Sequence, residues 1–220
     1  MGDVPATRDP ARQAAAVAHL GAADPVLGRL IAAVGPPALR HEPNYFAALV
    51  SAIVGQQISV SAASAIRARL AARIGADAPL TPAALLALTP DDLRAIGLSR
   101  AKERYVTDLA AKVASGAVDL AAIDRLPDEA VIAELVQVKG IGRWTAEMFL
   151  IFSLGRPDVL PVDDLGFRAA VHRQYGLAER PKAAELRALA EPWRPYRSFA
   201  TWYLWRSGAV EPQVAVPAPA

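Results

Sequence analysis

Apolar residues in this chain recur at intervals of three and four positions, the spacing that places them on one face of an α-helix. In residues 127–138, for example, Val131, Leu135 and Val138 share one face. Two acidic residues occupy the first turn of the same segment, where carboxylates suit the positive end of a helix. Alternating β-branched residues, the pattern of a strand, are rare. The sequence therefore predicts an all-α protein.

Capping residues and helix breakers divide the periodic stretches into separate helices. Asn44, Ser59 and Ser99 each precede an apolar-periodic segment, and all three are favoured N-cap residue types. Glycine and proline mark most of the other breaks. We expect helices at the following positions: two within 13–33, separated at 21–25, and then 45–53, 60–74, 81–88, 90–96, 100–113, 119–123, 128–138, 143–154, 165–174, 182–190 and 196–206.

The two ends of the chain lack this periodicity. Residues 1–12 mix glycine, proline, aspartate and arginine, and we expect them to be disordered. Residues 209–220 form a Pro/Ala-rich tail, which we expect to be disordered or to lie along the surface. The intervening residues 13–208 are enough for one large or two small packed domains.

Composition and charge exclude several classes of protein. The 24 basic residues nearly balance the 22 acidic ones, so any contact with DNA must be local; Arg100 and Lys102 are candidates for such a contact, or simply a solvated face. The absence of cysteine excludes disulfides and a cysteine-ligated iron–sulfur cluster. No membrane span or secretory signal is indicated. We therefore expect a soluble, cytoplasmic protein without a membrane partner.

A Gly-Ile-Gly link at residues 140–142 joins two of the predicted helices. Such a link leaves backbone N–H groups bare at the start of the second helix, which suits the binding of an anion. Ile141 is placed to fill the gap between the two helices. The simpler interpretation is a plain αα-hairpin whose glycines only permit a tight turn. The glycines alone leave both interpretations open.

An aspartate pair, Asp163 and Asp164, directly precedes the helix predicted at 165–174. Aspartate is a favoured N-cap, so helix capping alone would explain the pair. A carboxylate is also a group that can stabilise developing positive charge or position a water molecule in a reaction. The residues themselves do not decide between these roles, nor between the two aspartates.

Four blocks of sequence together resemble the helix-hairpin-helix DNA glycosylase superfamily, and within it the 3-methyladenine DNA glycosylase II (AlkA-like) branch. The blocks are residues 53–59, 135–146, 158–166 and 193–200. The resemblance implies a two-lobed all-α fold without the extra N-terminal α/β domain that some members carry. One lobe would hold residues of about 45–155, and the N-terminal and C-terminal helices would form the second.

The resemblance also implies an activity. The catalytic aspartate of this branch directly precedes a Leu-Gly type dipeptide, which indicates Asp164, with Asp163 as the reserve candidate. The expected enzyme is a monofunctional DNA glycosylase of base excision repair. It would flip out an alkylated base such as 3-methyladenine, hydrolyse the N-glycosidic bond and leave an abasic site. Bifunctional members use a hairpin lysine, and Trp144 stands at that position here.

The substrate pocket implied by the resemblance contains Trp144, Met148, Trp205 and Arg206. Met148 and Arg206 stand where the better-known bacterial member has aromatic residues, so this pocket is less aromatic. Electron-rich rings stack favourably on a cationic alkylated base, at about 0.5–2 kcal/mol per contact. The alternative for Trp144 is an ordinary core position.

The contacts with DNA are implied at two places. Gln56 and Gln57 occupy the loop in which the family inserts a side chain into the base stack; the alternative is that their amides cap helix ends. The backbone amides of Gly140, Gly142 and Thr145 would hold a DNA phosphate, which positions the duplex without reading its sequence.

In related hairpins main-chain carbonyls bind a monovalent cation, Na+ or K+, and the corresponding carbonyls are those of Val136, Val138 and Ile141. No other cofactor is implied. The expected partner is double-stranded DNA that contains alkylated bases, bound by a monomer. Two alternatives remain, a non-catalytic helix-hairpin-helix DNA-binding module and a helical scaffold without a nucleic-acid role. Neither of them needs Asp164 or the tryptophans.

Overall fold

The computed structural model describes residues 7, 9–39, 42–75 and 78–210. Within these residues the secondary structure consists of twelve α-helices and three short 3-10 helices, and no strand is present. The prediction of an all-α protein is therefore confirmed. The chain divides into two compact units, one made of residues 1–41 and 150–220 and the other of residues 42–149.

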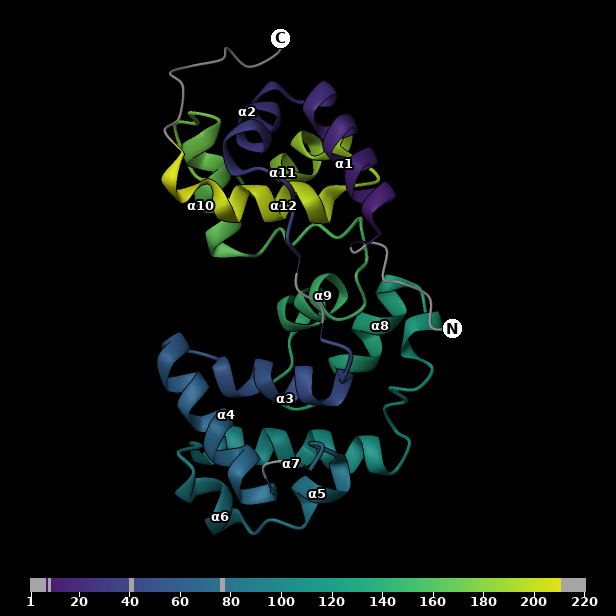
Figure 1. The fold of residues 1–220 in the computed structure, drawn as a ribbon, viewed down its shortest axis with the longest axis vertical. Helices are drawn as coiled ribbons and strands as arrows, with labels where there is room; N and C mark the ends of the chain where they lie inside the picture. The colour runs from purple at the N-terminus through teal and green to yellow at the C-terminus, as the bar shows by residue number, and fades with distance from the viewer. Residues whose placement is uncertain (1–6, 8, 40–41, 76–77, 211–220) are drawn as a thin grey trace. The chain divides into compact units, whose positions relative to one another are not determined.

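The unit of residues 42–149 is built around helix α7 (Arg100–Ala114). Its other elements are α3 (Tyr45–Gly55), α4 (Val60–Ile74), α5 (Pro82–Leu86), α6 (Pro90–Ala95), η1 (Ile123–Arg125), α8 (Asp128–Leu135) and most of α9 (Arg143–Phe152). α7 packs against α3, α5 and α6 (Figure 1). Its residues Val106, Leu109 and Ala110 are buried. Contacts with α7 therefore position much of this unit.

The unit of residues 1–41 and 150–220 is built around helix α12 (Arg197–Arg206), which packs against α2 and α10 (Figure 1). Its other elements are α1 (Pro10–Ala23), α2 (Pro25–Val34), α10 (Leu165–Gln174), α11 (Ala183–Leu189), η2 (Glu191–Trp193) and η3 (Ser207–Ala209). Every residue from Ser198 to Leu204 is buried. A helix covered on all sides belongs to the core.

A buried carboxylate joins the two chain segments of this unit. Oδ1 of Asp24 caps α2 by accepting hydrogen bonds from the N–H groups of Val26 and Leu27. Oδ2 accepts from the Tyr175 hydroxyl at 2.6 Å and from the Trp193 indole N–H at 2.9 Å. Burial and the Asp24 carboxylate raise the pKa of Tyr175, so its hydroxyl remains a donor. The N-terminal helices are thus fixed to the C-terminal ones.

The helix starts predicted from capping residues are confirmed. The side chains of Asn44, Ser59 and Ser99 each accept a hydrogen bond from the backbone N–H three residues later. Thr81 and Thr89 do the same at two short helices that open with proline. Each cap satisfies an N–H group that has no partner within its helix.

Two predicted helix positions were wrong. α1 begins at Pro10, within the stretch expected to be disordered, because Asp9 caps it and proline suits the first helical position. The helix expected at 119–123 is replaced by turns and the 3-10 helix η1. Oδ1 of Asp119 accepts hydrogen bonds from two following N–H groups, and such bonds compete with helix formation.

Three further helices end two or three residues earlier than predicted: α8 ends at Leu135, three residues short, and α5 at Leu86 and α9 at Phe152 are each two residues short. After α8 the N–H of Val138 bonds to the carbonyl of Leu135, which closes a tight turn. Residues 1–6 and 211–220, which hold most of the two predicted disordered ends, lie outside the described residues. None of the described helices is long and apolar enough to span a membrane.

Candidate active site and nucleic-acid interface

Asp164 is the N-cap of α10, and two donors orient its carboxylate. Oδ1 accepts a hydrogen bond from the backbone N–H of Phe167 at 2.5 Å and another from the indole Nε1–H of Trp205 at 2.9 Å. The Asp164 residue is half-buried, whereas Asp163 is exposed. Of the two aspartates, Asp164 is therefore the one that the helix start and the tryptophan hold in a defined orientation.

Packing around Trp205 fixes the donor as well. Its ring stacks on that of Phe152, with ring centroids 5.8 Å apart and planes inclined by 23°. A Cβ added to Gly166 would lie 3.3 Å from Oδ1 of Asp164 and 3.8 Å from the Trp205 ring. Glycine at this position thus lets the first turn of α10 approach both side chains. The sequence indicated Trp205 as a pocket residue but not its hydrogen bond to the carboxylate.

The segment that leads to Asp164, residues 157–164, is anchored at the N-terminal end of α12. The carboxylate of Asp158 accepts a hydrogen bond from Nε of Arg197 at 2.6 Å. Ser198 accepts through Oγ from a backbone N–H of the segment at 2.9 Å, and its own N–H donates to a carbonyl of the segment at 3.0 Å. Together with Trp205, these residues let α12 hold the segment at both ends. Sequence reasoning missed these contacts because their partners are far apart along the chain.

Arg206, the other residue of α12 predicted to line the pocket, is exposed. Its guanidinium carbon lies 5.3 Å from the centroid of the Trp202 ring, one turn earlier on the same helix. This distance is that of a cation–π contact. The structure therefore gives the Arg206 charge a partner on α12 itself.

The hairpin between α8 and α9 makes a turn that requires glycine at position 140. Gly140 has a φ of +82°, and a Cβ at this position would collide with the ring of Tyr105. Glycine is required here for two reasons: other residues rarely adopt this φ, and any side chain would collide with Tyr105. Ile141 is buried, as expected of a residue that fills the gap between the helices. The carbonyl of Gly142 accepts the first backbone bond into α9, from the N–H of Ala146.

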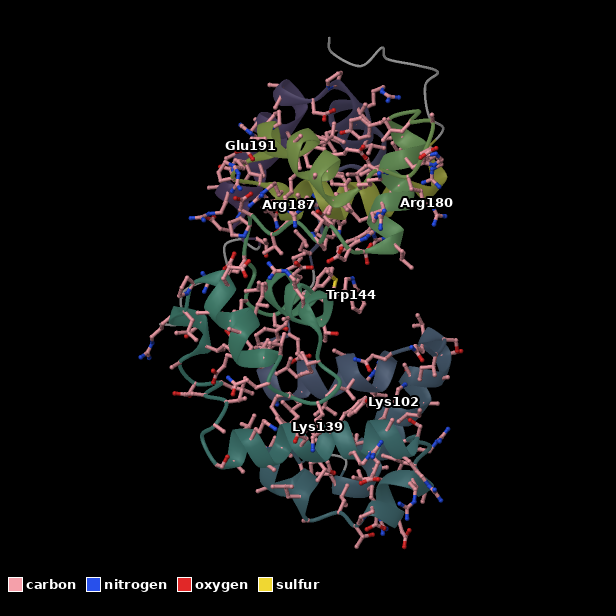
Figure 2. The ribbon with its side chains drawn as sticks, turned by 180° about the vertical axis from the view of Figure 1, so that it is seen from behind. Lys102, Lys139, Trp144, Arg180, Arg187 and Glu191 are labelled. Atoms are coloured by element: carbon pink, nitrogen blue, oxygen red, sulfur yellow. The ribbon has the colours of Figure 1, made fainter. Side chains whose placement is uncertain are left out.

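Helix α9 begins with an anchored arginine and continues with the predicted pocket residues. Arg143 donates to Glu129, with contacts of 2.5 and 3.0 Å, and to Glu147 at 3.1 Å. Trp144 is 44% exposed, so it is not a core residue (Figure 2). Met148 is half-buried and lies four residues further on, hence on the same helix face as Trp144.

Thr145, predicted to contact DNA through its amide, has a buried side chain in the first turn of α9. The first N–H groups of a helix have no partners within that helix. They also lie at its positive end, which favours a bound anion. The amides of Gly142 and Thr145 lie at this helix start.

The glutamine loop, residues 55–59, connects α3 with α4, and the structure gives its two glutamines different roles. Gln57 is exposed and has a φ of +56°, a backbone conformation that few residues other than glycine adopt. Gln56 instead donates from Nε2 to the carbonyl of Gly140 at 2.8 Å. The loop and the hairpin are thus joined by a direct hydrogen bond.

Lys102, predicted to face phosphate or solvent, binds the protein itself. Its ammonium group donates to the carbonyls of Val54 at 2.7 Å and Gln56 at 2.6 Å. Burial lowers the pKa of Lys102. The lysine therefore satisfies carbonyl groups at the C-terminal end of α3, where cations are favoured.

Two hollows lined by described residues contain none of the predicted site residues. One hollow of about 440 Å³ lies beside Asn44 and Tyr45, and another of about 430 Å³ lies beside α1 and Tyr203. Among the described residues no group of three or more histidine, aspartate or glutamate side chains is arranged to hold a metal ion. The predicted site residues lie at the start of α10, at the start of α9 and in the glutamine loop, where side chains reach the surface and neighbouring groups are held by hydrogen bonds.

A model of the HhH-GPD superfamily of base excision DNA repair proteins matches residues 50–195. This match includes the glutamine loop, the hairpin and Asp164. The chain belongs to the HhH-GPD superfamily. The family resemblance noted in the sequence and the helical fold that it implied are thereby confirmed.

Two curated proteins and one solved structure place this HhH-GPD protein among its relatives. It is 31% identical over 164 residues to YfjP of Bacillus subtilis, which covers 72% of this chain and 57% of YfjP. It is 34% identical over 193 residues to DNA-3-methyladenine glycosylase 1 of Schizosaccharomyces pombe, which covers 86% of this chain and 85% of that protein. The structure of the S. pombe 3-methyladenine DNA glycosylase Mag1 in complex with abasic DNA has a TM-score of 0.79 at 34% identity, over 87% of this chain and 95% of Mag1. The chain thus spans a little over half of YfjP but most of the yeast protein.

Proposed function

We propose that this protein is a monofunctional DNA glycosylase that removes alkylated bases such as 3-methyladenine from double-stranded DNA. The observation that carries the proposal is the Asp164 carboxylate, held at the start of α10 by Trp205 in a member of the HhH-GPD superfamily. A relative of similar length is named as a DNA-3-methyladenine glycosylase. Within that class we propose the type II enzyme, because Asp164 directly precedes Leu165-Gly166.

The chemistry follows from the charge that develops during the reaction. When the C1′–N bond breaks, its electron pair leaves with the base, and the sugar approaches an oxocarbenium ion. A fixed carboxylate stabilises that positive charge and orients the water, whose oxygen bonds to C1′ while one of its protons passes to the carboxylate and on to solvent. An alkylated purine already carries positive charge, so its departure needs little help from an acid. Asp164 supplies the carboxylate, and Trp205 keeps it from rotating.

The exposed tryptophan of α9 supports recognition of such a base. Trp144 presents a ring outside the core, and Met148 on the same helix face adds a polarisable side chain. An electron-rich ring attracts a cationic base more than a neutral one. We therefore propose cationic alkylated purines as the substrate class.

The residues at the hairpin support hydrolysis without strand cleavage. A bifunctional enzyme needs an amine that attacks the sugar, and Trp144 stands where such a lysine would be expected. Lys139, on the other side of the glycines, is largely exposed, and its ammonium group lies 3.7 Å from Asp108. The proposed product is an abasic site in an intact strand.

The test is single-turnover release of base from methylated duplex DNA by the parent protein, Asp164→Asn and Asp163→Asn. Asparagine still caps a helix, so α10 should form in the Asp164 variant. We expect Asp164→Asn to lower the rate by about 100-fold or more, since loss of an electrostatic stabiliser commonly has an effect of this size. Asp163→Asn, the matched control, should retain most of the activity. Product strands should break only after treatment with alkali.

Two results would change the proposal. A collapse of activity in Asp163→Asn with little effect in Asp164→Asn would transfer the catalytic role to the neighbouring aspartate. A parent protein that binds duplex DNA but releases no base from any alkylated duplex would make the non-catalytic DNA-binding module the better account.

We also propose that Na+ or K+ binds the hairpin through the main-chain carbonyls of Val136, Val138 and Ile141. The carbonyl of Val138 accepts a hydrogen bond from the N–H of Ile141 at 3.1 Å, and a carbonyl oxygen has a second lone pair for a cation. Rings of carbonyls are suitable ligands for such ions. Affinity for duplex DNA should fall several-fold when K+ is replaced by tetramethylammonium at equal ionic strength. Unchanged affinity would contradict this site.

A further inference from the structure

Helix α7 carries three side chains that reach the two loops predicted to touch DNA. Lys102, Tyr105 and Asp108 are spaced three residues apart, so they form one row along the helix surface. Six residues of helix correspond to about 9 Å. The row therefore spans a distance over which two neighbouring loops can be held at once.

The first end of the row holds the glutamine loop. Lys102 donates to the carbonyls of Val54 and Gln56, at 2.7 and 2.6 Å, so its ammonium group bridges the last turn of α3 and the beginning of the loop. Gln57 follows directly, with a φ of +56°. A bridged backbone on one side and a sparsely populated conformation next to it define the backbone from which the Gln57 side chain extends.

The middle and the other end of the row hold the hairpin. The Tyr105 ring packs so closely on Gly140 that no larger residue fits there. The carboxylate of Asp108 accepts a hydrogen bond from the backbone N–H of Lys139 at 2.9 Å. Lys112 donates to both oxygens of the same carboxylate at 2.8 Å, which keeps it oriented. Two adjacent hairpin residues are thus attached to one helix.

A direct link completes the frame. Nε2 of Gln56 donates to the carbonyl of Gly140 at 2.8 Å, across 84 positions of sequence. The glutamine loop is therefore connected to the hairpin once through its own side chain and once through α7. All of these residues belong to the unit of residues 42–149.

We propose that Lys102 is a positioning residue for base extrusion, which sets the reach of Gln57 into the duplex relative to the phosphate held by the hairpin. The inference rests on the proposed glycosylase function. Flipping a base costs a few kcal/mol, and the cost is smaller for a mismatched base than for a well-paired one. A side chain that fills the vacated space lowers this cost only if the loop that carries it keeps its distance from the bound backbone.

The test compares base release from two duplexes that carry the same lesion, 7-methylguanine, opposite cytosine in one and opposite adenine in the other. Lys102→Met removes the ammonium group and keeps a side chain of similar length. We expect it to slow release from the paired site about tenfold, which corresponds to about 1.4 kcal/mol in the barrier, and from the mismatched site by much less. The rate of release from the mismatched site divided by the rate from the paired site should therefore rise. Lys102→Arg, which retains donors, should restore most of the parent ratio.

Two further variants separate positioning from other effects. Arg104→Met removes an exposed cation from the same helix, so it controls for the loss of attraction to DNA and should leave the ratio unchanged. Gln56→Met breaks the link to Gly140 without altering α7 and should raise the ratio as Lys102→Met does. If Lys102→Met does not fold, Gln56→Met decides the question.

Equal losses at the paired and mismatched sites in both Lys102→Met and Gln56→Met would overturn the positioning role while leaving the glycosylase intact. An equal rise of the ratio in Arg104→Met would also overturn it, because charge alone would then explain the effect. Failure of the parent protein to release base from either duplex would instead contradict the proposed function, and the inference with it.

Discussion

Trp205 donates to the Asp164 carboxylate from a ring that also stacks on Phe152. Trp205→Phe would keep a ring for the stack and remove the N–H donor. A hydrogen bond to a charged group contributes about 1.5–3 kcal/mol, so the rate of base release should fall about 10- to 100-fold. Single-turnover kinetics measure this change. Trp202→Phe on the same helix is the matched control, and equal rates in both variants would argue against an orienting role for Trp205.

At the scale of single residues, the sequence predicted where a residue lies in its helix better than it predicted which residues it contacts. Asp164 was correctly expected near a helix start, because aspartate is a favoured cap. Its bond to Trp205 joins residues 41 positions apart and depends on how α10 packs on α12. Gln56 and Gln57 looked alike in the sequence, yet only Gln56 reaches the hairpin. Local patterns carry no information about partners that the tertiary fold brings together.

At the scale of elements, the attachment of the hairpin to α7 has a consequence for pH dependence. Burial of Asp108 raises its pKa, but hydrogen bonds from Lys112 and from the N–H of Lys139 lower it more, so the pKa lies below its ordinary value. A carboxyl group whose folded pKa is depressed stabilises the protein above its unfolded pKa, about 3.9 for aspartate. That contribution is lost as the pH falls through the folded value.

Asp108→Asn should therefore lower the free energy of unfolding by about 1.5–3 kcal/mol at pH 7, the range for a hydrogen bond to a charged group. The difference from the parent protein should begin to narrow below about pH 4, where the carboxyl group of the unfolded chain takes up a proton, and should vanish once the pH has fallen through the lower pKa of the folded state. Urea unfolding at several pH values measures it. Asp119→Asn, which alters an exposed carboxylate of the same unit, should show a smaller difference at pH 7. A difference for Asp108→Asn that does not change with pH would contradict the explanation.

Helix bounds were predictable where caps and periodicity agree, and less so elsewhere. The helix expected at 165–174 has the observed bounds of α10, since Asp164 caps it and apolar residues follow at helical spacing. The helix expected at 119–123 failed because Asp119 binds the backbone locally. The early start of α1 depends on Asp9. In each case a single side chain near the terminus decided the outcome.

At the scale of the whole molecule, the family was recognisable from four blocks of sequence, and the helical class from periodicity alone. Periodicity gave no division into units, which only the family resemblance implied, because one unit combines residues 1–41 with residues 150–220 and the other begins and ends within the chain. A contact such as that of Asp24 with Trp193 joins segments 169 positions apart. The lobe limit near residue 155, the cytoplasmic location and the monomeric state stay predictions.

Helix α12 forms hydrogen bonds to the segment before α10 through Ser198 near its start and Trp205 near its end. One residue inserted between these two positions would turn everything beyond it by about 100° around the helix axis, and would swing the indole away from its carboxylate. A substitution in α12 alters the strength of one of these contacts. A change in length instead alters the angle around the helix axis between Ser198 and Trp205. Homologous proteins that use this aspartate should therefore keep the number of residues from 198 to 205 fixed.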